Sequence, residues 1–120
     1  MLCSIISIYF LGGYIMENNM ELISFELISN VGEAKSLLME ALVLAREEKF
    51  DEADAKVATA GEFLSKAHHS HFGLVQQEAN GEQLPFSLIL MHAEDQLMTT
   101  ETLKIVAEEF IELYSDKYHQ

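Results

Sequence analysis

The histidine at position 92 and the aspartate at position 95 are the residues of this sequence best suited to chemistry. They stand three residues apart within the segment LPFSLILMHAEDQLMTT, residues 84–100, and this spacing places both side chains on one face of a helix. The residues alone leave three interpretations open. His92 is a partly buried histidine paired with a carboxylate, or it joins Asp95 in an incomplete metal site, or it attacks phosphorus and holds a phosphoryl group.

The composition predicts that these residues lie in an all-α fold. The chain has 120 residues, with one proline and no tryptophan, and it is rich in strong helix formers such as Ala, Leu, Glu and Met. One compact domain is expected at this length. The formal net charge of −13 disfavours contact with phosphate backbones or anionic lipid surfaces, so we expect neither nucleic acid nor direct membrane insertion.

Apolar residues at spacings of three and four predict two long helices before the His92 segment. The first lies between Met20 and Arg46, and the second is capped by Asp51 and runs to about Ala79. The apolar face of the first helix consists of Leu27, Val31, Ala34, Leu38, Ala41 and Ala45. That of the second consists of Ala53, Val57, Ala60, Leu64, Ala67, His71 and Leu74.

A third helix is predicted from the apolar run at 86–91 to about Tyr118. Asn80-Gly81 marks the turn before it, and Pro85 favours a helical first turn. Three helices with short connections pack as an antiparallel up-down-up bundle. The third helix also carries a half-polar stripe at spacings of three and four, which we name the outer stripe: Leu88, His92, Asp95, Thr99, Thr102 and Val106. A second stripe favours contact with another copy of the chain, with a solvated stripe as the alternative.

Residues 1–15 differ from the rest of the chain. They carry no charge, and a second methionine, Met16, opens the polar sequence that follows them. A signal peptide would need basic residues and a membrane span roughly 20 apolar residues, so both are disfavoured. We expect an extension outside the fold at 1–15 and the domain at 16–120. Cys3 is the sole cysteine, which leaves the domain without a thiol and favours a reducing cytoplasm.

The run His92-Ala93-Glu94-Asp95-Gln96-Leu97-Met98-Thr99 resembles a known signature. It is similar to the H-[AG]-Q-D-H-L-M-T of the lactose/cellobiose/chitobiose-specific IIA family of the bacterial phosphoenolpyruvate-dependent sugar phosphotransferase system (PTS). Residues 67–71, Ala-His-His-Ser-His, resemble that family's A-H-x-x-Q, and Gly81-Glu82 and the segment at 110–114 are also similar to family members. The resemblance covers roughly Met16 to Lys117.

This resemblance implies a phosphocarrier. His92 would accept a phosphoryl group from phospho-HPr and pass it to the cysteine of the IIB component, for uptake of a β-linked disaccharide. Cellobiose is the first expectation, followed by lactose or diacetylchitobiose. The resemblance also implies a homotrimer in which three copies of Asp95 meet around one structural Mg²⁺ on the three-fold axis.

Three departures from the family pattern lie close to the motif. Glu94 stands where the family usually has Gln, Gln96 where it has His, and His71 where the second helix has Gln. Gln96 donates hydrogen bonds but cannot become cationic. His71, on the inward face, is a candidate to supply the missing imidazole, with His68 as further support, or it is an ordinary residue of that face. The position of Glu94, two residues from His92, predicts that it points away from the site.

The surroundings of His92 contain no local cation, because no Lys or Arg occurs between Lys66 and Lys104. Partners would then supply the positive charge, docking on Leu88, Leu90 and Met91. Two alternatives are a non-catalytic helical interaction module and a histidine phosphotransfer domain of the two-component type. The latter usually places a basic residue near its histidine.

Overall fold

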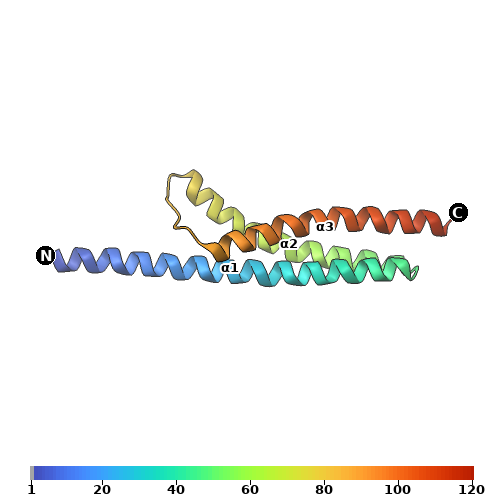
Figure 1. The fold of residues 1–120 in the computed structure, drawn as a ribbon, viewed down its shortest axis with the longest axis horizontal. Helices are drawn as coiled ribbons and strands as arrows, with labels where there is room; N and C mark the ends of the chain where they lie inside the picture. The colour runs from blue at the N-terminus through green and yellow to red at the C-terminus, as the bar shows by residue number, and fades with distance from the viewer. Residues whose placement is uncertain (1) are drawn as a thin grey trace.

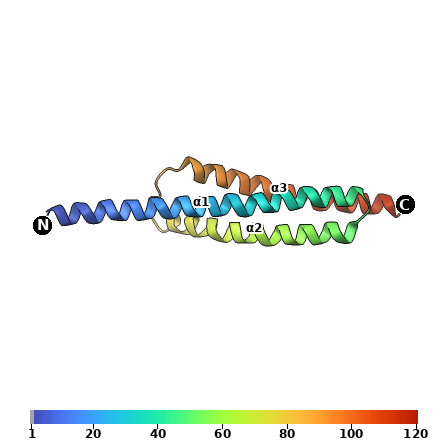
Figure 2. The same ribbon diagram turned by 90° about the horizontal axis from the view of Figure 1, so that it is seen from below.

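The computed structural model describes the backbone of residues 2–120 and the side chains of residues 19–120. It consists of three helices, α1 (Leu2–Arg46), α2 (Phe50–Ala79) and α3 (Leu88–Tyr118). Figures 1 and 2 show the chain running along the bundle, returning, and running along it again. No strand occurs in the backbone that the structure describes. The predicted all-α, up-down-up arrangement is confirmed.

The core follows the apolar spacing of the sequence. Helix α1 packs against both other helices, whereas α2 and α3 contact each other less extensively. All six predicted core positions of α1 and six of the seven in α2 are buried. The seventh, His71, is only partly buried. The core side chains of α1 and α2 are Leu27, Val31, Ala34, Leu38, Ala41, Ala45, Ala53, Val57, Ala60, Leu64, Ala67 and Leu74.

The turn from α1 to α2 closes through backbone hydrogen bonds. The amide of Glu48 donates to the carbonyl of Ala45 at 3.1 Å, and that of Lys49 donates to Leu44 at 2.9 Å. Glu48 therefore adopts the left-handed conformation at φ 64°, a place where glycine is usual. The prediction that Asp51 caps α2 is wrong. Lys49 is the N-cap, without a side-chain hydrogen bond, and Asp51 lies in the first turn, where the helix dipole favours a negative charge.

The connection from α2 to α3 confirms the predicted turn at Asn80-Gly81. Gly81 has φ 91° and donates to the carbonyl of Glu78 at 3.0 Å, while Glu82 donates to Gln77 at 3.1 Å. The α3 helix begins at Leu88 and ends at Tyr118. Pro85 therefore precedes the helix instead of forming its first turn. Figure 1 shows the C-terminal turns of α2 diverging from the other two helices before this connection.

The N-terminal prediction remains a prediction. The bounds of α1 begin at Leu2, but the side chains of residues 1–18 lie outside the described range, and with them the prediction that 1–15 stand apart from the fold. Among the described residues, no helix is both long enough and apolar enough to cross a membrane.

Candidate functional site

The first turn of α3 places His92. Ser87, in an extended conformation, is the N-cap, and its hydroxyl accepts a hydrogen bond from the amide of Leu90 at 3.2 Å. Its carbonyl accepts from the amide of Met91 at 3.1 Å. These bonds begin the helix one turn before His92, whose side chain is exposed. A cap of this kind satisfies amides that have no partner within the helix.

Helix α3 has two faces with different surroundings. Its inner face is buried in the bundle core and consists of Leu90, Ala93, Leu97, Thr100, Ala107 and Ile111. Every member of the outer stripe is exposed, including both His92 and Asp95. No hydrogen bond or ion pair joins His92 to Asp95 among the described residues. The interpretation of His92 as a partly buried histidine paired with a carboxylate is therefore wrong.

The outer stripe contains threonines whose hydroxyls are already paired. Thr99 Oγ1 donates to the backbone carbonyl of Asp95 at 2.8 Å, and Thr102 Oγ1 donates to that of Met98 at 3.2 Å. Next to them lies a shallow groove of about 490 Å³, lined by Met98, Thr99, Thr102, Leu103 and Val106. Asp95 is the one carboxylate of the outer stripe. The two threonine hydroxyls of the stripe already donate hydrogen bonds to backbone carbonyls of α3.

Within one chain, the described residues form no cluster that could hold a metal. No group of three or more His, Cys, Asp or Glu side chains gathers in that part of the structure. A single exposed carboxylate binds a divalent cation weakly, because such ions prefer six or more oxygen ligands. A metal at Asp95 therefore requires carboxylates from further copies of the chain.

On the opposite side of α3, Glu94 contacts α2. His71 Nε2 and Glu94 Oε1 lie 2.8 Å apart, and their side chains are 14% and 38% exposed. Glu94 thus points away from the outer stripe, as its position predicted. The imidazole of His71 is engaged by Glu94, and no described hydrogen bond joins it to His92 or to the half-buried Gln96.

His68, the other predicted support residue, lies one turn earlier on α2. Its Nδ1 atom is 3.4 Å from Glu101 Oε1, and both side chains are substantially exposed. His68 and His71 therefore both face carboxylates of α3, and their predicted roles at the phosphoryl group stay predictions.

The predicted docking residues differ in exposure. Leu88 and Met91 expose 71% and 52% of their surface, whereas Leu90 is buried, with 9% exposed. The prediction that Leu90 forms part of a docking surface is wrong, because it lies on the inner face of α3 and packs into the core. Leu88 and Met91 leave an exposed apolar surface beside His92.

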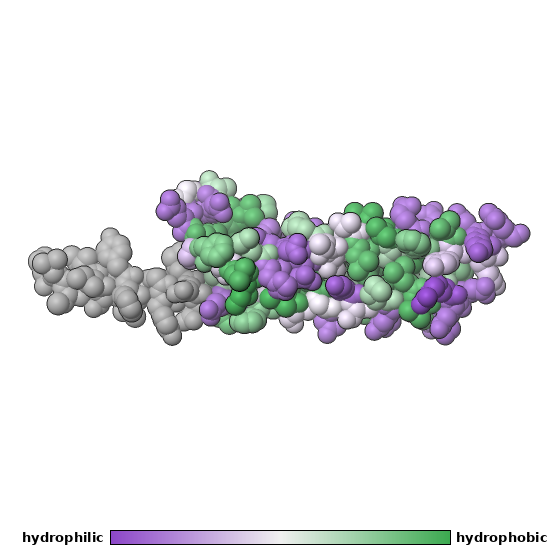
Figure 3. All heavy atoms as spheres, in the orientation of Figure 1, coloured by the Kyte–Doolittle hydropathy of each residue, from purple (hydrophilic) through white to green (hydrophobic). Residues whose placement is uncertain are grey.

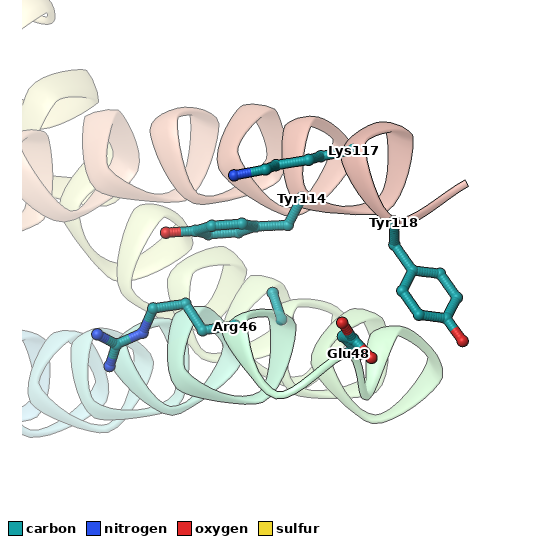
Figure 4. Close-up of a pocket in the computed structure, with 6 residues that line it drawn as sticks. Arg46, Glu48, Tyr114, Lys117 and Tyr118 are labelled. Atoms are coloured by element: carbon teal, nitrogen blue, oxygen red, sulfur yellow. The ribbon is translucent and has the colours of Figure 1, made fainter. Parts of the chain in front are cut away.

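A pocket of about 410 Å³ lies at the other end of the bundle, lined by Ala45, Arg46, Glu48, Tyr114, Lys117 and Tyr118 (Figure 4). Its two basic residues occupy the last turns of α1 and α3. Cations are stabilised there by the partial negative charge of helix C-termini. The pocket is roughly 38 Å along α3 from His92 at the helical rise per residue. It is not part of the His92 site.

Comparison with known proteins decides the family. Residues 22–115 match the family described as the lactose/cellobiose-specific IIA subunit of the PTS. The chain belongs to this family of phosphotransferase components. This IIA subunit is 46% identical over 97 residues to the oligo-beta-mannoside-specific EIIA component of Bacillus subtilis strain 168, covering 81% of this chain and 88% of the relative.

Solved structures of IIA proteins have the same fold. The cellobiose-specific enzyme IIA from Bacillus anthracis superimposes with a TM-score of 0.81 at 44% identity, covering 84% of this chain and 93% of that one. The IIA(chitobiose) chain solved in complex with HPr, from Escherichia coli, superimposes with a TM-score of 0.73 at 31% identity, covering 82% and 96%. The three-helix IIA fold is therefore shared along most of each chain.

The sequence did not reveal the pairing of His71 with Glu94. The two residues are 23 positions apart, on different predicted helices. A signal was present, because both positions depart from the resembled family pattern, which has Gln at each. The imidazole at position 71 and the carboxylate at position 94 can form a hydrogen bond with each other.

The cap at Ser87 generates a prediction. Replacing Ser87 with Ala removes the acceptor for the Leu90 amide and should lower the free energy of unfolding by about 1 kcal/mol. Amide hydrogen exchange in residues 88–91 should also accelerate. Urea denaturation and exchange measurements test this, with Ser87→Asp as the control that keeps a cap. An alanine variant as stable as the parent would contradict the role assigned to the cap.

Proposed function

We propose that this IIA subunit accepts a phosphoryl group from phospho-HPr on His92 and transfers it to the cysteine of a IIB component. The observation that carries the proposal is the exposure of His92 on the outer face of α3, within the motif run 92–99. The family match gives the coarser function, a sugar phosphotransfer component. The complex of a related IIA protein with HPr supports the donor.

The chemistry consists of two displacements at phosphorus. A nitrogen of the neutral His92 imidazole forms a bond to phosphorus while the bond from phosphorus to the HPr histidine breaks. In the second step the IIB thiolate attacks the same phosphorus, and the bond to His92 breaks. A side chain exposed on a helix can meet two different partners in succession, as this sequence of steps requires.

The surface near His92 suits transient docking. Leu88 and Met91 flank the histidine with exposed apolar surface, and Phe86, before the helix, is 82% exposed. No Lys or Arg occurs between Lys66 and Lys104, so hydrogen-bond donors or cations for the transferring phosphoryl group come from the partner or from another copy of the chain. The net charge of −13 favours a partner with a basic docking surface.

The outer stripe supports a homotrimer. Its part from Asp95 to Val106 is the part that would meet other copies: Val106 and the neighbouring Met98 are exposed in a single subunit, and a groove lies beside them. Figure 3 shows hydrophobic surface alternating with hydrophilic surface along one side of the molecule. Because the hydroxyls of Thr99 and Thr102 are paired with backbone carbonyls, burying them against a second copy leaves no donor unsatisfied.

Asp95 would then be the charged residue at the centre of the assembly. Carboxylates brought together in a poorly solvated interior repel one another, unless a cation or protons neutralise them. Three carboxylates with waters form an oxygen site suited to Mg²⁺, so we propose one structural ion per trimer. The ion would stabilise assembly, while His92 carries the phosphoryl group.

The sugar and the compartment complete the proposal. A phosphocarrier binds no sugar, so the disaccharide is inferred from relatives: cellobiose first, then lactose or diacetylchitobiose. A cellobiose-specific relative at 44% identity and a lactose-specific relative at 45% identity support a β-linked disaccharide, while their names do not rank the two sugars. We place the protein in the cytoplasm, where phospho-HPr is available. Membership of the IIA family decides against a two-component phosphotransfer domain and a non-catalytic helical module.

Loss of His92 tests the acceptor. Replacing His92 with Ala should abolish labelling from phosphoenolpyruvate through enzyme I and HPr, because no other side chain of the domain stands at the motif position. Variants of His68, His69 and His71 should still be labelled. Retained labelling of the His92→Ala protein would exclude His92 as the acceptor.

Substitution of Asp95 tests the assembly. Asp95→Leu removes the repulsion and the ligand together, so the trimer should persist or tighten and no longer respond to chelator. Asp95→Lys should dissociate it, because three cations then meet at the axis. Light scattering with and without chelator measures both effects. A parent protein that is monomeric at all concentrations, or an Asp95→Lys trimer of unchanged stability, would mean that the stripe faces solvent.

A further inference from the structure

The contact between His71 and Glu94 connects α2 to the turn of α3 that carries His92. Glu94 is two residues after His92, and its carboxylate accepts a hydrogen bond from His71 Nε2 across 2.8 Å. His71 is 14% exposed, so its imidazole is largely withdrawn from water. Among the described contacts, this is the polar link from another helix that lies nearest in sequence to His92.

The link lies between the two helices of the bundle that share the least contact. Helices α2 and α3 contact each other less than either contacts α1, and Figure 1 shows the last turns of α2 diverging from α3. The inner face of α3 has the small side chain of Ala93 at this level. Apolar burial is non-directional, whereas a hydrogen bond fixes distance and angle. The contact between His71 and Glu94 therefore adds a directional constraint on the rotation of α3 to the one that its buried inner face provides.

Rotation of α3 moves His92 directly. Residues two positions apart are separated by roughly 200° around a helix, so Glu94 and His92 project from nearly opposite sides. Holding the Glu94 side against α2 therefore holds His92 and Asp95 at a constant direction on the outer stripe. Reaction at phosphorus depends steeply on such placement, since displacement by a fraction of an ångström weakens the alignment of the attacking atom.

We propose that His71 and Glu94 are positioning residues for phosphoryl transfer, acting as one hydrogen-bonded unit that sets the orientation of His92. The proposal rests on the proposed function of His92. Both residues depart from the resembled family pattern, and together they form an acid-base pair where that pattern has two amides. The pair faces α2 and not the exposed surface at Leu88 and Met91, so it acts on the reaction and not on docking.

A double-mutant cycle tests the pair. The proteins are the parent, His71→Leu, Glu94→Leu, the double leucine variant and the double glutamine variant, with His69→Leu as a control that removes an exposed α2 histidine. Transfer from phospho-HPr is followed to separate kcat from KM. Each single leucine variant should lose kcat by between about threefold and thirtyfold at unchanged KM, which lies within the range that the coupling of contacting residues spans. The double leucine variant should lose no more than the larger single loss, because the link is already absent. The double glutamine variant should stay within about twofold of the parent, because two amides can hydrogen-bond to each other.

A merely structural role would have another signature. It would lower the melting temperature of the single variants and leave kcat unchanged well below that temperature. Unchanged kcat in both single leucine variants, or a loss in the double leucine variant equal to the product of the two single losses, overturns the proposal.

A second measurement keeps the two proposals separate. Amide hydrogen exchange in residues 88–97 requires no phosphoryl transfer and should accelerate in each single leucine variant, but not in the double glutamine variant. Unchanged exchange in both single variants overturns the positioning role. A parent protein that accepts no phosphoryl group overturns the proposed function, and the exchange data then still decide whether the pair orients α3.

Discussion

Helix α3 has two faces with different requirements, one buried in the subunit and one facing outward, and the rest of the structure depends on this constraint. Its inner face, from Leu90 to Ile111, completes the subunit core, while the outer stripe carries His92 and Asp95 away from that core. Because the two faces share one backbone, every contact that fixes the inner face also fixes the direction of His92. The cap at Ser87, the burial of Leu97 and the link through Glu94 all serve that end.

The acidic character of the chain determines how the site can work. With a net charge of −13 and no basic residue near His92 in the sequence, the subunit itself provides little to neutralise a phosphoryl group. In the proposed relay, a phosphohistidine that the subunit stabilises little can pass its phosphoryl group on readily to the next partner. The basic residues at the far end, Arg46 and Lys117, occupy the last turns of their helices and are too distant to contribute.

Much of the fold could be predicted because the apolar spacing is regular. The buried positions of α1 and α2 follow it, and Gly81 and the end at Tyr118 were placed correctly. The helix caps were harder to predict from the sequence, because they depend on side-chain rotamers. Asp51 does not cap α2. The N-cap of α3 is Ser87, so this helix starts after Pro85. The prediction that Leu90 is a docking residue was wrong, because Leu88, Leu90 and Met91 are all apolar and the sequence does not indicate which of them faces the core. The contact between His71 and Glu94 depends on how two helices cross, which periodicity does not encode.

Nuclear magnetic resonance of the ¹⁵N-histidine-labelled parent protein can show whether His92, exposed on the outer stripe, is the one imidazole that accepts a phosphoryl group. The chain has five histidines, so each ring can be followed separately. On addition of phospho-HPr, one ring nitrogen of His92 should acquire coupling to phosphorus, while the rings of His68, His69, His71 and His119 remain uncoupled. Phosphorus coupling at any of those four, or at no histidine, would contradict this assignment.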